Sequence, residues 1–275
     1  MIPGKNMNRI DKKFQQLKER GETAFIPFIT AGDPSIEITK SLILDFENRG
    51  ADLIELGFPF SDPIADGPVI QSSYFRALEG GVKTDDILEM VKGIRKTSEI
   101  PIVCMISHSI LYKHGCGKFL ERAADAGIDG ATIPDLPIEE AESIIAIANQ
   151  VGFKVVCFIA PTTTDSRMKI IVEKSQGFLY YISVVGITGE RNTLSDDLAV
   201  NIKKIKSRTD LPVALGFGIS TPEQARVAGQ IADGVIVGSA IMREIDKYAE
   251  GEGKLLVDSV GRFLGEFIES SKGRI

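Results

Sequence analysis

The feature of this sequence that most limits its fold is a repeat of short apolar segments separated by amphipathic ones. Eight runs rich in β-branched residues begin near residues 25, 51, 100, 129, 153, 177, 211 and 233. These runs are almost continuously apolar, which is typical of parallel strands buried on both faces. Between them lie stretches such as SIEITKSLILDFENRG and IEEAESIIAIANQVG, whose apolar residues recur with helical spacing.

Eight strands that alternate with helices predict an α/β fold, a (β/α)8 TIM barrel formed by one domain over residues 1–275. A doubly wound open sheet is the alternative, but no G-x-G-x-x-G motif follows the first strand. The segment RIDKKFQQLKERG predicts an extra N-terminal helix that closes the bottom of the barrel. A short helix is expected after strand 8, at GSAIMREI, before a long final helix at KLLVDSVGRFLGEFIESS.

Composition argues against several classes of function. The net charge is −6 and there is no basic cluster, so we expect no nucleic-acid partner. The apolar windows are far shorter than the roughly 20 residues that span a bilayer, and MIPGKNMNRIDKKF lacks the apolar core of a signal peptide. Three cysteines without C-x-x-C spacing and only two histidines favour a cytoplasmic protein without a His/Cys metal site.

Candidate catalytic residues are sought at the carboxyl ends of the strands, where barrel enzymes place them. Glu55 lies in the apolar run LIELG, and burial there would raise the pKa of its carboxyl group. A hidden Lys or Arg partner is the alternative interpretation. Asp62 and Asp66 follow in a loop expected over roughly residues 57–73. Either Asp alone suits a turn, but Glu55 and Asp66 together suit paired acid–base catalysis.

The segments after the last three strands predict a binding site. VVGITGERN, after strand 6, is expected to form either a hinged lid or a plain surface loop. LGFGISTPEQ and GVIVGSAIMREI, after strands 7 and 8, contain glycines that let a ligand approach the backbone and a helix start at Gly238 and Ser239. Barrels commonly bind phosphate at these two loops. The residues thus predict an enzyme that binds a phosphorylated small molecule and performs isomerisation, aldol-type cleavage or elimination.

Five segments together resemble the tryptophan synthase alpha subunit family: FIPFITAGDP, IELGFPFSDPIADGPVIQ, GITG, GFGIS and GSAI. The resemblance covers essentially the whole chain. It implies a retro-aldol lyase of tryptophan biosynthesis that cleaves indole-3-glycerol phosphate to indole and glyceraldehyde 3-phosphate, with no cofactor or metal in this chain. It also implies a β subunit as partner in an α2β2 heterotetramer. That partner would carry pyridoxal phosphate and condense indole with serine.

The resemblance also implies roles for individual residues. Glu55 would be the acid–base group at the indole ring and the glycerol hydroxyl, and Asp66 would act at the indole N–H. Asp62 and Pro63 would face the partner. The implied substrate-binding positions in the indole pocket, the lid and the phosphate site are Phe28, Tyr180, Thr188, Gly189, Phe217, Gly218, Gly238 and Ser239.

One segment departs from the family pattern. Residues Ser107, His108 and Ser109 stand where the family usually has an aromatic pair followed by Asn, close to the expected indole wall and partner contact. Three alternatives therefore remain: a stand-alone indole-releasing lyase, a catalytically weak activating partner of a β subunit, and another phosphate-binding barrel such as an isomerase of the same pathway. Retention of both acids disfavours the second, and the specific segment from Glu55 to Asp66 disfavours the third.

Overall fold

The computed structural model describes residues 7–63, 66–182, 196–216 and 218–272, and its eight parallel strands close into a barrel in chain order. This confirms the expected TIM barrel. The strands are β1 (Ala24–Thr30), β2 (Ile54–Gly57), β3 (Ile102–Met105), β4 (Gly130–Thr132), β5 (Lys154–Ile159), β6 (Leu179–Ile182), β7 (Val213–Gly216) and β8 (Gly234–Val237).

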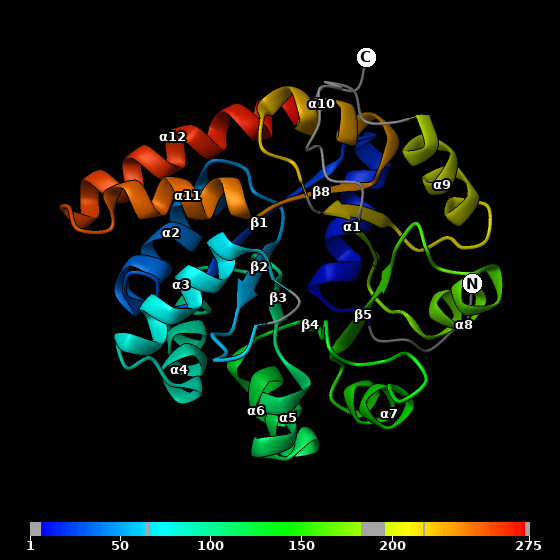
Figure 1. Cartoon of the computed structure of the whole chain (residues 1–275), viewed down its shortest axis with the longest axis horizontal. Helices are drawn as coiled ribbons and strands as arrows, with labels where there is room; N and C mark the ends of the chain where they lie inside the picture. The colour runs from blue at the N-terminus through cyan, green and yellow to red at the C-terminus, as the bar shows by residue number, and fades with distance from the viewer. Residues whose placement is uncertain (1–6, 64–65, 183–195, 217, 273–275) are drawn as a thin grey trace.

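Helices surround the strands (Figure 1). Within the described residues they are α1 (Arg9–Arg20), α2 (Ile36–Asn48), α3 (Pro68–Glu79), α4 (Thr84–Ile94), α5 (His108–His114), α6 (Cys116–Ala126), α7 (Glu142–Gln150), α8 (Asp165–Lys174), α9 (Asp196–Lys206), α10 (Pro222–Ile231), α11 (Ser239–Tyr248) and α12 (Gly253–Lys272). None of these helices, as far as the structure describes them, is long and apolar enough to cross a membrane.

The strand residues divide between two apolar clusters because successive side chains point to opposite faces of the barrel wall. Outward residues such as Phe25, Leu56 and Val235 pack against the surrounding helices in the larger cluster. Inward residues such as Ile26 and Val103 form a smaller cluster inside the barrel. Burial on both faces explains why the strands read as continuous apolar runs.

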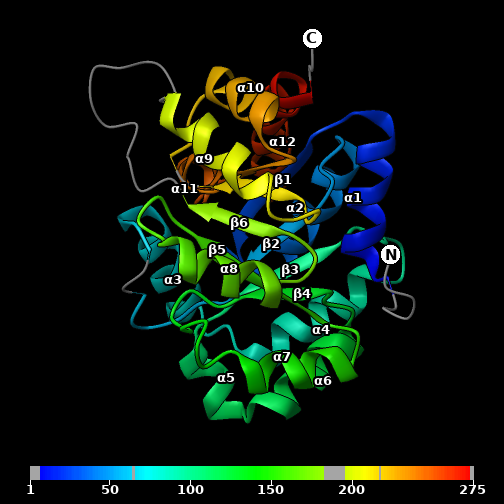
Figure 2. The ribbon, with the colours of Figure 1, turned by 90° about the vertical axis from the view of Figure 1, so that its right-hand side faces the viewer.

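The extra helix α1 closes the amino-terminal end of the barrel, as expected from the sequence. Its residues Ile10, Phe14 and Leu17 lie on one helical face and join the inner cluster. The Phe14 ring lies 5.4 Å from that of Phe178. In Figure 2 the β6 arrow points away from α1, so the carboxyl ends of the strands are at the opposite end of the barrel.

Two local expectations were wrong. The loop after β2 is shorter than the predicted 57–73, because Gly67 is the N-cap of α3 and Pro68 its first residue, a position where a missing N–H costs nothing. The sequence also missed α5, which begins immediately after β3 with Ser107 as its N-cap. The short helix expected after β8 is present as α11, which begins at Ser239.

Phe14→Ala should destabilise the fold by about 3–5 kcal/mol, because it leaves a void between α1 and the inner cluster. The exposed neighbour Gln15→Ala on the same helix is the matched control and should change stability by less than about 0.5 kcal/mol. Urea unfolding followed by circular dichroism measures both. Equal stabilities of the two variants would show that α1 does not close the barrel.

Candidate active site

Glu55 is a buried carboxylic acid in the barrel wall. It lies on β2 opposite Phe28 of β1, and only 2% of its surface is exposed. Two hydroxyls donate hydrogen bonds to its carboxyl group, from Thr132 to Oε1 at 3.1 Å and from Tyr180 to Oε2 at 3.4 Å. Burial raises the pKa of Glu55 to about 8, since these two hydrogen bonds offset only part of the desolvation. Among the described residues, no Lys or Arg pairs with Glu55.

Asp66 is the second acid of the site. The loop that carries it is held by backbone contacts: the Asp66 N–H donates to the Pro63 carbonyl at 3.1 Å. The Gln71 side-chain amide donates to the carbonyls of both residues, at 2.8 Å and 3.3 Å. Partial burial, and then the nearby charge of Asp135, raise the pKa of Asp66 to about 6. Between about pH 6 and 8, Glu55 is therefore mostly protonated while Asp66 is mostly ionised.

Both acids line one cavity of about 380 Å³ at the carboxyl-terminal end of the barrel. Hydrophobic, polar and glycine positions from several strand ends complete its wall, as is usual for small-molecule sites. The lining residues are Phe28, Glu55, Asp66, Gly67, Ile70, Met105, Tyr180, Gly218, Ile219, Ser220, Ile236, Gly238, Ser239 and Arg243.

The aromatic part of this cavity depends on close backbone approach. A Cβ atom at Gly57 would lie 2.6 Å from the Phe28 ring, and one at Gly216 would lie 2.4 Å from the Tyr180 ring. Both distances are well inside van der Waals contact, so a side chain at either position would displace an aromatic ring of the cavity. Tyr180 also packs against Phe158, with ring centroids 4.9 Å apart.

A further part of the cavity wall is the N-terminus of α11, whose Gly238 lies next to Phe28. Its N-cap is Gly238, no side chain caps the first turn, and the first turn contains no acidic residue. The neighbouring α10 differs, because Thr221 and Gln224 form the capping box expected from the sequence and satisfy its first amides. Of these two helices, only α11 therefore offers uncapped amides to an anion in the cavity.

The Ser107–Ser109 segment lies beside this cavity rather than in its wall. Together with Asp62 and Pro63 it lines a neighbouring cavity of about 280 Å³, which shares Asp66 and Met105 with the first. The Ser107 hydroxyl and the His108 N–H both donate to Asp135, at 2.6 Å and 2.7 Å. The charge of Asp135 in turn contributes to the raised pKa of Asp66.

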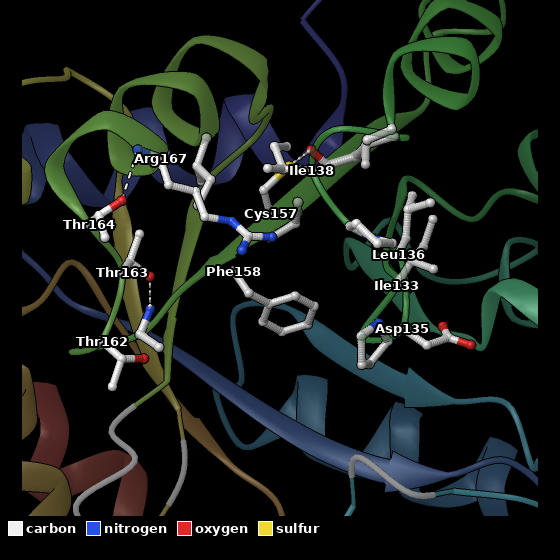
Figure 3. Close-up of a pocket in the computed structure, with 17 residues that line it drawn as sticks. Ile133, Asp135, Leu136, Ile138, Cys157, Phe158, Thr162, Thr163, Thr164 and Arg167 are labelled. Atoms are coloured by element: carbon white, nitrogen blue, oxygen red, sulfur yellow. Dashed lines mark hydrogen bonds between the residues drawn. The ribbon is translucent and has the colours of Figure 1, made fainter.

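A larger cavity of about 580 Å³ lies between the loop after β4 and α8, and contains neither acid. Figure 3 shows Arg167 extending from α8 into this cavity, with Asp135 on the opposite side. The Arg167 guanidinium donates to Glu139 at 3.2 Å, so its charge is already paired. Within the described parts of the chain, no group of three or more His, Cys, Asp and Glu side chains is placed to hold a metal ion.

The structure brings together most of the residues singled out from the sequence. Glu55, Asp66 and five of the substrate-binding positions line the same cavity: Phe28, Tyr180, Gly218, Gly238 and Ser239. Thr188, Gly189 and Phe217 lie outside the described residues. Asp62 is exposed and Pro63 is buried.

Sequence reasoning missed Thr132, Met105 and Arg243. Thr132 and Met105 are the last residues of β4 and β3, so their place at a strand end was the available signal. For Arg243 the available signal was weaker: this residue follows the predicted site residue Ser239 by one helical turn.

The closed barrel, with two carboxylates at the carboxyl ends of its strands, defines a TIM-barrel enzyme of the acid–base type. A family model described as tryptophan synthase alpha chain matches residues 14–267. The chain belongs to the tryptophan synthase alpha chain family. The predicted family and the alpha-type lyase class are confirmed.

Relatives and solved structures agree with this assignment. The tryptophan synthase alpha chain of Thermoanaerobacter sp. (strain X514) is 48% identical over 241 residues, 88% of this chain and 92% of that one. That of Clostridium kluyveri (strain ATCC 8527) is 44% identical over 264 residues, with 96% and 99% covered. The structure of tryptophan synthase subunit alpha from Legionella pneumophila str. Paris has a TM-score of 0.89 at 37% identity, with 97% and 99% covered.

The raised pKa of Glu55 predicts a pH-dependent cost to stability. The unfolded chain releases this proton near the ordinary value of 4.5, whereas the folded chain releases it at about 8. The stability associated with neutral Glu55 is therefore fully present below pH 4.5 and is lost as the pH rises to about 8. The stability of Glu55→Gln relative to the wild type should therefore increase as the pH rises from 4.5 to about 8, and should stay constant at higher pH.

Urea unfolding midpoints at several pH values between 5 and about 9 measure this difference. Glu79→Gln is the control for the same chemical change at an exposed position, the end of α3. Parallel pH curves for wild type and Glu55→Gln would show that the Glu55 pKa is not raised by folding.

Proposed function

We propose that Glu55 and Asp66 perform the retro-aldol cleavage by which the tryptophan synthase alpha family converts indole-3-glycerol phosphate into indole and glyceraldehyde 3-phosphate. The observation that supports this most directly is the unequal environment of the two acids in one cavity. Glu55 has a pKa of about 8 and Asp66 one of about 6. Near neutral pH the site thus holds one proton donor and one anion.

Glu55 acts as the general acid and then as the general base. Its carboxylic acid protonates C3 of the indole ring, which places positive charge on the ring nitrogen. The Glu55 carboxylate then takes the proton of the glycerol C1 hydroxyl. The bond between C3 and C1 breaks, its electron pair returns to the ring, and C1 becomes the aldehyde. Glu55 ends the cycle protonated, so the step needs no other reactant.

Asp66 stabilises the cationic ring. As an anion it accepts a hydrogen bond from the indole N–H and offsets the positive charge that develops there when C3 is protonated. Its pKa of about 6 keeps it ionised at the pH where Glu55 is still an acid. The two roles cannot be exchanged, because Glu55 is the more buried group and the one that is neutral at pH 7.

The shape of the cavity suits the two ends of this substrate. Phe28 and Tyr180 supply aromatic surface beside Glu55 for the indole ring. Gly218, Gly238 and Ser239 supply backbone amides for the phosphate, with the uncapped first turn of α11 behind them. Thr188 and Gly189 are proposed to form a lid over the site, and Phe217 is proposed to contact the phosphate.

The partner is proposed to be a tryptophan synthase β subunit in an α2β2 assembly located in the cytoplasm. Pyridoxal phosphate would belong to that subunit and not to this chain. A solved structure titled tryptophan synthase from M. tuberculosis, aminoacrylate-bound form, has a TM-score of 0.85 to this chain at 28% identity, with 97% and 100% covered. Exposed Asp62 and its neighbour Pro63 are the proposed contact, at the rim of the cavity that adjoins Asp66.

Glu55→Gln should lower the rate of indole release by at least about 10²-fold, because the amide neither gives nor takes a proton. Asp66→Asn should lower it similarly while leaving the fold intact, because Asp66 is partly exposed. The assay mixes the purified chain with indole-3-glycerol phosphate and follows indole. Glu79→Gln is the matched control and should retain wild-type turnover. Near-wild-type rates in either active-site variant would overturn its assigned role.

A matching β subunit should raise the rate of indole release, since closing the loop around Asp66 excludes water and positions the acids. Pro63→Gly should raise the β-subunit concentration that gives half-maximal activation by about tenfold, the effect of losing one important interface residue. Titration of indole release with β subunit measures both.

The alternatives give different titrations. Rates that are substantial and do not change with β subunit would identify a stand-alone lyase. Binding of β subunit without indole release in any mixture would identify a non-catalytic activating partner.

A further inference from the structure

The cavity that holds Glu55 and Asp66 has one cationic side chain in the described part of its wall, Arg243. Arg243 lies on α11, four residues after Ser239, so the two side chains lie on the same face of the helix. Gly238 and Ser239, at the start of this helix, line the cavity beside it. Arg243 is solvent-exposed although it lines the cavity.

Among the described residues, Arg243 makes no hydrogen bond or ion pair. The acidic residues closest to it on the same helix are already paired with other cations. Glu244 accepts from Lys247 at 2.5 Å, and Asp246 pairs with Arg76 at 2.8 Å. Within the described parts of the chain, the guanidinium of Arg243 is therefore unpaired, unlike that of Arg167 in the larger cavity.

A phosphate bound in this cavity would be stabilised by an additional cation. A phosphate monoester carries about −1.5 to −2 charges at pH 7. The uncapped N-terminus of α11 contributes only about +0.5, and Asp66 adds a negative charge to the same cavity. The helix terminus alone leaves most of the phosphate charge unbalanced.

We propose that Arg243 is a further substrate-binding residue, whose guanidinium pairs with the phosphate held at the N-terminus of α11. This inference rests on the proposed function for the identity of the substrate. Two parallel N–H donors of the guanidinium match two phosphate oxygens, while the α11 amides hold the phosphate from the helix side. Arg243 thereby favours the phosphorylated substrate over its phosphate-free analogue and holds the glycerol end away from Asp66.

The test measures binding to the full chain by titration calorimetry with glycerol 3-phosphate, inorganic phosphate and indole as probes. Arg243→Gln should weaken glycerol 3-phosphate and phosphate binding by about tenfold, the effect of one exposed charge-assisted contact. Indole binding should stay within about twofold, because the indole end is formed by other residues. Arg243→Lys keeps the charge and should retain more of the phosphate affinity than Gln does.

Arg226→Gln is the matched control. Arg226 is a partly exposed arginine on α10 that pairs with Glu223 and does not line the cavity. It should leave all three affinities unchanged. In turnover assays Arg243→Gln should raise KM for indole-3-glycerol phosphate about tenfold with little change in kcat, because the phosphate contact exists in both ground and transition states. Higher salt should also reduce the difference between wild type and Arg243→Gln.

The outcomes separate this inference from the proposed function. Unchanged phosphate affinity in folded Arg243→Gln, or equal loss of phosphate and indole binding, would overturn the role of Arg243. If the wild type releases no indole but Arg243→Gln still loses phosphate affinity selectively, the proposed function fails and the phosphate contact stands.

Discussion

Closure of the eight-stranded barrel is the constraint on which the rest of this molecule depends. Closure encloses the inward side chains, so the interior must be filled by residues of the strands or of the elements at the two ends of the barrel. At the amino-terminal end, α1 supplies Ile10, Phe14 and Leu17 to the inner cluster. The other end holds the cavity with the two acids, which is lined by residues at the carboxyl ends of the strands and in the loops and helices that follow them.

The protonation states of the two acids depend on how deeply each one is buried in the barrel. Glu55 lies within the wall, where desolvation dominates and its carboxyl group stays protonated to about pH 8. Asp66 lies on a loop above the wall and is less buried, so it ionises at a lower pH. The uncapped end of α11 and Arg243 provide positive potential on another side of the same cavity. One cavity thus holds a proton donor, an anion and an anion-binding region.

Residues 107–109, where the sequence departs from the family pattern, contact Asp135, and the charge of Asp135 affects Asp66. Ser107 and His108 together donate two short hydrogen bonds to this carboxylate, which holds it near Asp66. The charge of Asp135 raises the Asp66 pKa, and the same residues line the small cavity beside Asp62 and Pro63.

Local sequence pattern predicted the eight strands, the closing helix α1 and the capping box of α10, and it singled out Glu55 and Asp66 as candidate acids. These features depend on local pattern: runs of apolar residues, helical spacing, and a charge inside an apolar segment. Contacts between residues far apart in the sequence could not be predicted in this way: the Thr132 and Tyr180 hydroxyls donate to Glu55, and Arg243 lines the same cavity as Glu55. The two hydrogen bonds join residues up to 125 positions apart, and they depend on strand register and on the depth at which each side chain enters the closed barrel.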